Sequence, residues 1–244
     1  MNIYVISLRR STERRASIVQ QFKSAGLNFE FFDAVDGRAV PPHPLFRNYN
    51  YLKRLWLTSG KMPSKGELGV YGSHYLLWQK CIESNEPIVV MEDDAVLQNS
   101  MPEYIGLISE KIKKYGFLRL EPKAYKGELH KKEVGLNYTI SFMTANFDGL
   151  RCYAISPQAA KRLVDNSTRW CMPVDNYVGS IYLHKVPSYI FQPSVVENTE
   201  SFETTIQLDE EKKAKWFRKP TRELYSLYRK LVMFVVNMKY SNEK

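Results

Sequence analysis

Three consecutive carboxylates, Glu92, Asp93 and Asp94, follow the apolar residues 88–91. Such a run predicts a strand buried on both faces of a helix-covered sheet, where ligands bind beyond the carboxyl ends of the strands. Because side chains alternate along a strand, we expect Glu92 and Asp94 to point to one side and Asp93 to the other. Two carboxylates on one side can share a divalent cation, Mg²⁺ or Mn²⁺, with substrate phosphates. The competing interpretation is a solvated acidic turn after a strand.

A strand–helix–strand unit precedes the acidic residues. Residues 3–8 and 28–32 predict two strands, and residues 11–26 predict the helix between them, which Gly26 ends. Polar residues and glycine at 33–38 predict a loop after the second strand. Units of this kind favour a parallel sheet.

The segment that leads into the acidic strand predicts an excursion and then a helix. Residues 39–65 hold three prolines around His43 and are interpreted as a long excursion or flap. From Gly66 the spacing of apolar residues predicts a helix, with Ser73 and His74 on another face.

Later segments continue the α/β pattern. They are a helix at 101–114, a strand at 116–120, a charged connection at 122–137, short strands at 138–142 and 152–155, and helices that begin near 156 and 173. The fold class that follows is α/β, with a mixed, mostly parallel sheet flanked by helices. We expect one catalytic domain at residues 1–210 and a basic helical tail at residues 211–244.

Length and composition bound the class of protein. With 244 residues and 44% hydrophobic content, the chain can bury one large core. Its three cysteines are odd in number and widely spaced, which favours a reducing compartment over disulfides or a zinc site. The first ten residues lack the long apolar region of a signal peptide, and no window approaches the roughly 20 apolar residues of a membrane span. We therefore expect a protein that stays inside the cell.

Positive charge is concentrated at the end of the chain. Residues 211–244 hold ten Lys/Arg and three Asp/Glu, whereas the rest of the chain is nearly balanced. A pI near 9.3 suits a nucleic-acid-binding module, but charge confined to the tail and an acidic centre argue against a nucleic acid partner.

Six short motifs occur in an order that resembles the family 25 glycosyltransferases, which include bacterial lipooligosaccharide galactosyltransferases and are related to collagen galactosyltransferases. The motifs are Val5-Ile6-Ser7-Leu8 with Arg14-Arg15, Phe32-Asp33-Ala34-Val35-Asp36-Gly37, Gly66-Glu67-Leu68-Gly69 with Ser73-His74, Val90-Met91-Glu92-Asp93-Asp94, Tyr153-Ala154-Ile155-Ser156-Pro157 with Ala159-Ala160, and Pro173-Val174-Asp175. Together they cover about residues 1–200.

The resemblance implies a GT-A-like nucleotide-sugar fold, a UDP-sugar donor and β-linked transfer with inversion. It implies that Glu92 to Asp94 form the Asp-x-Asp motif of this chain, with Asp94 as the metal ligand and Glu92 facing the ribose or the metal. The first strand, through Ser7 and Leu8, and the loop at 33–37 would hold the uridine. The donor-binding residues expected on this basis are Ser7, Leu8, Arg14, Ala34, Asp36, Glu92 and Asp93.

Sugar transfer needs a stabilised diphosphate and a base for the acceptor hydroxyl. A metal neutralises charge on the diphosphate, and a carboxylate can take the proton. Asp175 is the candidate base; it lies near a predicted helix N-terminus, where we expect it to remain ionised, and its alternative role is helix capping. His74 could bind phosphate or join the metal shell, although a lone histidine on a helix is more often structural.

Other candidate residues keep two interpretations each. Arg14 could meet a phosphate or the edge of the uracil. Asp36 could accept a hydrogen bond from ribose or shape the turn before Gly37, and these roles are compatible. The expected reaction moves a hexose, with galactose as first candidate, from UDP to a lipooligosaccharide. A metal-dependent nucleotidyltransferase is the enzymatic alternative, since it also needs carboxylates at strand ends.

The tail predicts a basic amphipathic helix. Its apolar residues at helical spacing are Leu224, Leu227, Tyr228, Leu231, Val232 and Val235. Such a helix is typical of an anionic membrane surface, and a lipid-linked acceptor would be found there. We expect a peripheral protein on the cytoplasmic face of the bacterial inner membrane; the alternative is a helix that packs on the body. The sequence leaves the oligomeric state open.

Overall fold

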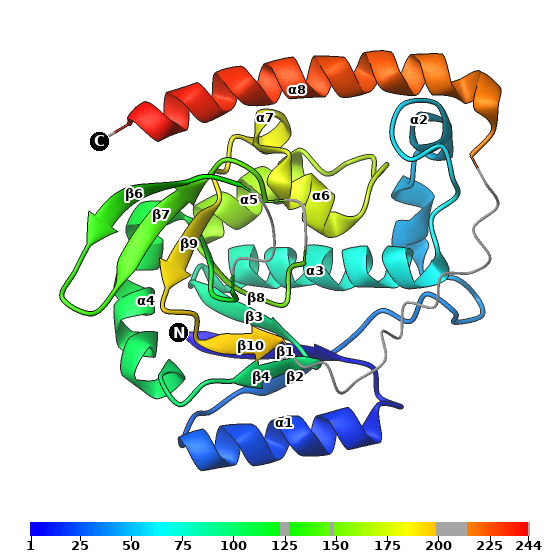
Figure 1. Ribbon diagram of the computed structural model, residues 1–244. Coiled ribbons are helices and arrows are strands. Elements are labelled where there is room, and N and C mark those ends of the chain that lie inside the picture. The colour runs from blue at the N-terminus through cyan, green and yellow to red at the C-terminus, as the bar shows by residue number, and fades with distance from the viewer. Residues whose placement is uncertain (123–126, 147–148, 199–213, 244) are drawn as a thin grey trace.

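The computed structural model describes residues 1–122, 127–146, 149–198 and 214–243 (Figure 1). Its elements are β1 (Asn2–Ser7), α1 (Thr12–Ala25), β2 (Glu30–Asp33), the 3₁₀ helix η1 (Pro44–Asn48), α2 (Tyr51–Trp56), α3 (Lys65–Ser84), β3 (Ile88–Glu92), β4 (Ala95–Leu97), α4 (Met101–Tyr115), β5 (Phe117–Arg119), β6 (Leu129–Val134), β7 (Thr139–Met143), β8 (Cys152–Ile155), α5 (Pro157–Asp165), α6 (Val174–Gly179), α7 (Ile181–His184), β9 (Tyr189–Gln192), β10 (Val196–Asn198), the 3₁₀ helix η2 (Trp216–Arg218) and α8 (Lys219–Asn242).

An eight-stranded sheet forms the centre, in the order β2-β1-β3-β8-β5-β9-β7-β6. β1 pairs in parallel with β2 and β3, whereas β8 is antiparallel to both β3 and β5. β9 is parallel to β5, and β7 and β6 follow in antiparallel steps. All strands except β8 and β7 therefore run in one direction. The expected α/β fold with a mixed, mostly parallel sheet is confirmed.

Helices cover both faces of the sheet because its central strands are apolar on both sides. Tyr4 and Ile6 of β1 belong to the core under α3 and α5, whereas Ile3 and Val5 belong to the core with α1 and α4. β3 divides its residues in the same alternating way. Buried residues fill β3 up to Met91, as the continuous apolar run predicted.

Local signals placed several helix ends correctly. Gly26 adopts the left-handed conformation, with φ 63°, and its N–H bonds the carbonyl of Lys23 at the end of α1. The Ser156 Oγ accepts a hydrogen bond from the Ala159 N–H at the start of α5. These contacts satisfy backbone groups that a helix end would otherwise leave unpaired.

Two segments differ from the prediction. The excursion at 39–65 contains η1 and α2 rather than only irregular chain. The charged connection at 122–137 contains β6, the strand at one end of the sheet. The prediction of a plain connection was wrong because β6 has a polar sequence and is stabilised by pairing with β7, not by an apolar face.

The loop after β2 is pressed against the start of α3. A Cβ added to Gly69 would lie 2.4 Å from the Val35 carbonyl oxygen, and one added to Gly37 would lie 1.7 Å from that of Lys65. Glycine at both positions permits this backbone approach. The loop is thereby held beside the ends of β1 and β3.

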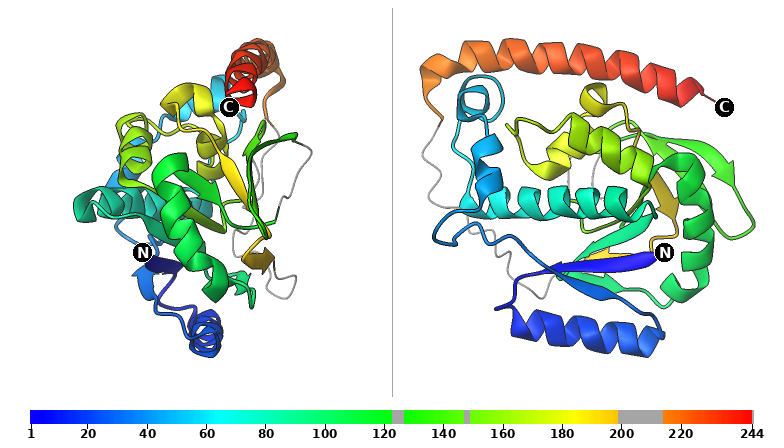
Figure 2. Two further views of the ribbon diagram at one scale, coloured as in Figure 1. Left: turned by 90° about the vertical axis from the view of Figure 1, so that its left-hand side faces the viewer. Right: turned by 180° about the vertical axis from the view of Figure 1, so that it is seen from behind.

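The last helix, α8, lies along one end of the molecule beyond α2 and α7, and α1 lies at the opposite end (Figures 1 and 2). The predicted boundary between residues 210 and 211 falls in the segment 199–213, outside the described residues. Among the described residues, no helix combines the length and apolarity needed to cross a membrane.

Candidate functional site

A pocket of about 220 Å³ opens at the carboxyl ends of β1 and β3, beside the loop after β2. Its lining residues are Ile6, Ser7, Leu8, Arg10, Ser11, Arg14, Ala34, Val35, Asp36, Gly37, Arg38, Gly66, Gly69, Val70, Ser73, His74, Glu92, Asp93 and Asp94. Every predicted donor-binding and metal residue is in this set, together with His74. Asp175 is not.

All three carboxylates of the acidic triplet line the pocket. Residues 93 and 94 form a turn after β3. Glu92 contacts His74 of α3, whereas Asp93 contacts Arg14 of α1 on the opposite face of the sheet, so these two side chains diverge as strand alternation predicts. Asp93 accepts a hydrogen bond from the Ser7 Oγ at 2.6 Å and pairs with the Arg14 Nη1 at 3.1 Å. Its contacts tie β3 to β1 and α1.

Glu92 ends a buried chain of hydrogen bonds. The His74 Nε2 lies 3.2 Å from the Glu92 Oε1, and the His74 Nδ1 lies 3.0 Å from the Tyr153 hydroxyl. The Trp78 Nε1–H donates to the same hydroxyl at 2.9 Å. Because indole only donates, the arrangement that pairs every hydrogen has Tyr153 donating to Nδ1 and Nε2–H donating to Glu92. His74 is fully buried and orients this carboxylate.

Asp94 carries the features of a cation ligand. Burial, and then the neighbouring charge of Glu92, raise the pKa of Asp94 to about 6. Its Oδ2 lies 3.5 Å from the Arg151 Nε, while its Oδ1 is buried without a hydrogen-bond partner. A buried carboxylate oxygen beside a second carboxylate fits a divalent cation. No three His, Cys, Asp or Glu side chains gather as ligands within the described ranges, so substrate oxygens and water would complete the shell.

Asp36 already has partners in the loop after β2. It forms an ion pair with Arg10 and accepts a hydrogen bond from the Arg38 N–H at 2.9 Å. The hydrogen bond from Arg10 holds the pKa of Asp36 below its usual value. The turn-shaping role is therefore present in the structure, and the ribose contact stays a prediction. Arg10 and Arg38 also add positive charge to the pocket wall.

Asp175 lies in the first turn of α6 and accepts a hydrogen bond from the Asn176 N–H at 2.7 Å. Burial raises its pKa, and the charge of Glu92 adds to the rise. That Asp175 remains ionised stays a prediction, in which burial opposes ionisation and the helix N-terminus favours it. A carboxylate with a raised pKa is a better proton acceptor. The charge of Asp175 also raises the pKa of Glu67 of α3, so Asp175 lies near both Glu67 and Glu92.

A buried polar cluster next to Asp94 was not predicted from the sequence. The Arg119 Nη2 lies 3.1 Å from the Glu121 Oε1 and donates to the Gly149 carbonyl, while the Arg151 N–H donates to Glu121 at 3.1 Å. Burial raises the pKa of Glu121 to about 7. The cluster fixes the backbone from which Arg151 reaches Asp94. A charged residue inside the apolar run at 116–120 was the signal that could have revealed it.

These features define a class of protein. Carboxylates at the ends of parallel strands, a glycine-lined loop and surrounding guanidinium groups form an α/β site suited to a nucleotide with a divalent cation. The family model of glycosyltransferase family 25, described as an LPS biosynthesis protein, matches residues 1–178. The chain belongs to this family, as its motifs predicted, and its architecture agrees with the GT-A-like fold that the resemblance implies.

Two relatives and one solved structure show what this chain is similar to. A glycosyltransferase 25 family member of Aedes aegypti is 30% identical over 72% of this chain and 30% of its own length. The lipooligosaccharide biosynthesis protein lic2B of Haemophilus influenzae is 33% identical over 42% of this chain and 37% of its own. A crystal structure of a glycosyltransferase involved in glycosylation of the PBCV-1 major capsid covers 93% of this chain and 98% of its own, at 9% identity and a TM-score of 0.42. The chain thus spans under a third of the mosquito relative.

Proposed function

We propose that this protein transfers a hexose, with galactose as first candidate, from its UDP form to a lipooligosaccharide acceptor, giving a β linkage with inversion. Membership of glycosyltransferase family 25 and the likeness to a lipooligosaccharide biosynthesis protein support the reaction class and the acceptor. The observation that carries the proposal is the pocket itself, where Glu92, Asp93 and Asp94 meet Arg10, Arg14 and Arg38.

The donor half of the site would use β1 and the loop after β2. Uridine would contact Ser7, Leu8 and Ala34, which line the pocket, and the ribose would lie beside Asp36. Arg14, which forms an ion pair with Asp93, would face the diphosphate. Hydrogen bonds from Ser7 and Arg14 hold Asp93 in place, so it positions these donor-binding groups.

Asp94 and Glu92 would hold a divalent cation, Mn²⁺ or Mg²⁺. When bound, the cation supplies charge that neutralises the leaving diphosphate. The unpartnered Asp94 Oδ1 and the proximity of the two carboxylates fit this role. His74 would act as a positioning residue, because its Nε2–H orients Glu92.

Asp175 would act as the base. The acceptor oxygen attacks the anomeric carbon, the bond from that carbon to the UDP oxygen breaks, and the acceptor proton passes to the Asp175 carboxylate. Its raised pKa suits proton acceptance, and the contribution of the Glu92 charge to that rise supports a position of Asp175 near the donor site.

A donor screen tests the reaction. Purified protein is incubated with UDP-galactose, UDP-glucose and UDP-N-acetylglucosamine, each with Mn²⁺ or with excess chelator, and UDP and pyrophosphate are both measured. We expect slow UDP release from one donor, fastest with Mn²⁺ and absent from Asp94→Asn. In a parallel incubation with UTP and a hexose 1-phosphate in place of the UDP-sugar, release of pyrophosphate would establish the nucleotidyltransferase alternative. Equal UDP release in chelator would refute the metal assignment.

A further inference from the structure

Helix α8 has two different apolar faces. One face packs on the body, where Met233 is buried, the Arg222 Nε donates to the Thr58 carbonyl at 3.2 Å and the Asn237 Nδ2 donates to the Thr144 carbonyl at 2.8 Å. The Tyr240 ring meets the Phe142 ring at 5.7 Å near the far end. The helix is therefore attached to the body along its length.

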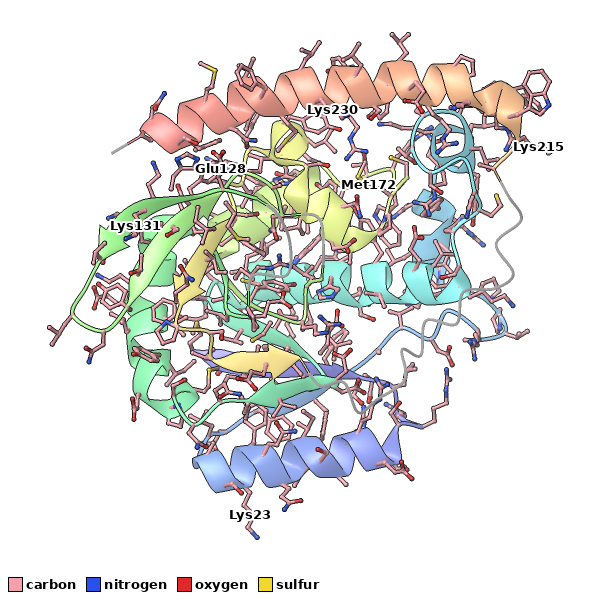
Figure 3. All side chains as sticks on the ribbon, viewed as in Figure 1. Lys23, Glu128, Lys131, Met172, Lys215 and Lys230 are labelled. Atoms are coloured by element: carbon pink, nitrogen blue, oxygen red, sulfur yellow. The ribbon has the colours of Figure 1, made fainter. Side chains whose placement is uncertain are left out.

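The other face points away from the body (Figure 3). We call it the outer stripe: Leu224, Leu227, Tyr228, Leu231, Phe234, Val235 and Met238. These side chains recur at steps of three and four residues and are 51–70% exposed. Trp216, at the start of the helical segment, is 85% exposed. A contiguous apolar stripe of this kind on a soluble surface marks an interaction site.

The charge beside the outer stripe indicates its partner. Residues 214–243 hold seven Lys/Arg and two Asp/Glu. Lys219 and Lys230 are exposed along one border of the stripe, Lys239 lies along the other, and Figure 3 shows Lys215 and Lys230 at the surface of the helical segment. A second copy of the chain would bring these like charges together, whereas an anionic lipid surface would neutralise them.

We propose that the outer stripe of α8 lies in the headgroup region of an anionic phospholipid bilayer, parallel to its plane, with Trp216 in the interface. Apolar residues on one side and basic residues along the borders are the composition of interfacial helices. No described helix is apolar and long enough to span a bilayer, which agrees with a helix lying on the surface. The anionic cytoplasmic leaflet of the bacterial inner membrane is the surface proposed.

Docking through α8 would orient the rest of the molecule. The views agree that α8 and α1 are at opposite ends, with α6 and α7 on the α8 side (Figures 1 and 2). α2 connects the two regions. Thr58, just after α2, accepts a hydrogen bond from Arg222 of α8, and Arg54 of α2 pairs with Glu67 at 2.8 Å, near Asp175. If the proposed function holds, the base side would face a lipid-linked acceptor and the donor side would face the aqueous phase.

Vesicle co-sedimentation without any sugar substrate tests the proposal, so its failure is distinguishable from failure of the proposed function. Full-length protein is mixed with vesicles of phosphatidylglycerol and phosphatidylcholine, or of phosphatidylcholine alone. We expect binding to the anionic vesicles, weakened by salt. The double variant Leu227→Glu/Leu231→Glu should lower the affinity by about tenfold or more. Leu136→Glu, at an exposed leucine outside α8, is the matched control and should bind normally.

Charge reversal gives an independent comparison. Lys219→Glu/Lys230→Glu should weaken binding to anionic vesicles, whereas Lys113→Glu on α4 should leave it nearly unchanged. Brominated phosphatidylcholine in the anionic vesicles should quench part of the tryptophan fluorescence, and Trp216→Phe should remove that quenchable part. All these side chains are exposed, and thermal melting of each variant would verify its fold.

Three results would overturn the proposal. One is equal vesicle binding by the native protein and the outer-stripe double variant. Another is undiminished lipid quenching in Trp216→Phe. The third is that the native protein has no vesicle affinity and is a dimer by light scattering, whereas the double variant is a monomer. That last result would assign the stripe to a second copy of the chain.

Discussion

The His74 Nε2 lies 3.2 Å from the Glu92 Oε1, and this contact joins the buried face of α3 to the acidic end of β3. His74 has no exposed surface, while Glu92 lines the pocket. The histidine therefore acts on the site through the carboxylate that it orients. Its other ring nitrogen is held by the Tyr153 hydroxyl, which fixes the ring.

Replacing His74 by Ala should lower Mn²⁺ affinity by about 10- to 100-fold, the usual effect of losing a group that orients a metal ligand. Tyr153→Phe should act in the same direction and more weakly, because the ring keeps Nε2 near Glu92. Calorimetric titration of Mn²⁺ in the presence of UDP would measure both. His130→Ala, on β6 outside the pocket, is the control. Unchanged Mn²⁺ affinity in His74→Ala would reduce His74 to a packing residue.

Asp94→Asn should abolish Mn²⁺ binding and metal-dependent UDP release while the fold persists, because the amide keeps the shape and removes the charge. Asp93→Asn should retain Mn²⁺ but bind UDP less tightly, since it weakens the hold on Ser7 and Arg14. Electron paramagnetic resonance of free Mn²⁺ separates the two effects. Asp165→Asn, at an exposed position on α5, should behave as the native protein. If Asp93→Asn instead lost Mn²⁺ and Asp94→Asn kept it, Asp93 would be the metal ligand and Asp94 would position the donor-binding groups.

Asp175→Asn should lower the rate of sugar transfer by about a hundredfold or more while UDP affinity hardly changes. Because burial raises the pKa of Asp175, the native rate should fall as pH drops through a value above the ordinary Asp pKa near 3.9. The variant should lose this acid limb. Loss of UDP affinity together with turnover would instead make Asp175 a donor-site or structural residue.

The buried His184 predicts a pH effect on stability. Its Nδ1 accepts from the Val186 N–H at 3.1 Å and its Nε2 lies 3.0 Å from the Tyr177 carbonyl, an arrangement of the neutral ring. Burial lowers its pKa to about 4. The unfolded state therefore binds a proton first, and the free energy of unfolding should decrease as pH falls from about 6.5 to about 4, by about 1.4 kcal/mol per pH unit.

Urea unfolding at pH values across that interval would measure the slope. His184→Asn, which keeps an acceptor for the Val186 N–H, should remove this part of the pH dependence although it lowers stability overall. A native slope that the variant retains would mean that other groups are responsible.

Local sequence signals determined much of the fold. Gly26 and Ser156 mark helix ends through contacts with residues at most four positions away, so their roles need no knowledge of the rest of the chain. The apolar residues before Glu92 predicted a buried strand because both of its faces are covered. β6 was missed for the opposite reason, since its polar sequence becomes a strand only through pairing with β7.

The sequence predicted most residues of the site but not the contacts between them. The acidic triplet, Ser7 and His74 were identified from residue types and motif order, yet which carboxylate meets which partner depends on contacts between distant segments. Ser7 and Asp93 are 86 positions apart, and the Arg119 side chain reaches Gly149 across 30. No periodic pattern encodes such pairs.

The sequence of α8 determined an amphipathic, basic helix and left open whether it packs on the body or on a membrane. Only the tertiary structure decided which side of the helix the body covers. Met233 is buried there, while Leu224 and Leu231 stay exposed, although all three are apolar and close in sequence. Val232, which the sequence placed in the same apolar set as Leu224 and Leu231, is half-buried. The physical reason is that hydrophobicity sets how much a side chain gains from burial, but the partner surface decides which side chains obtain it.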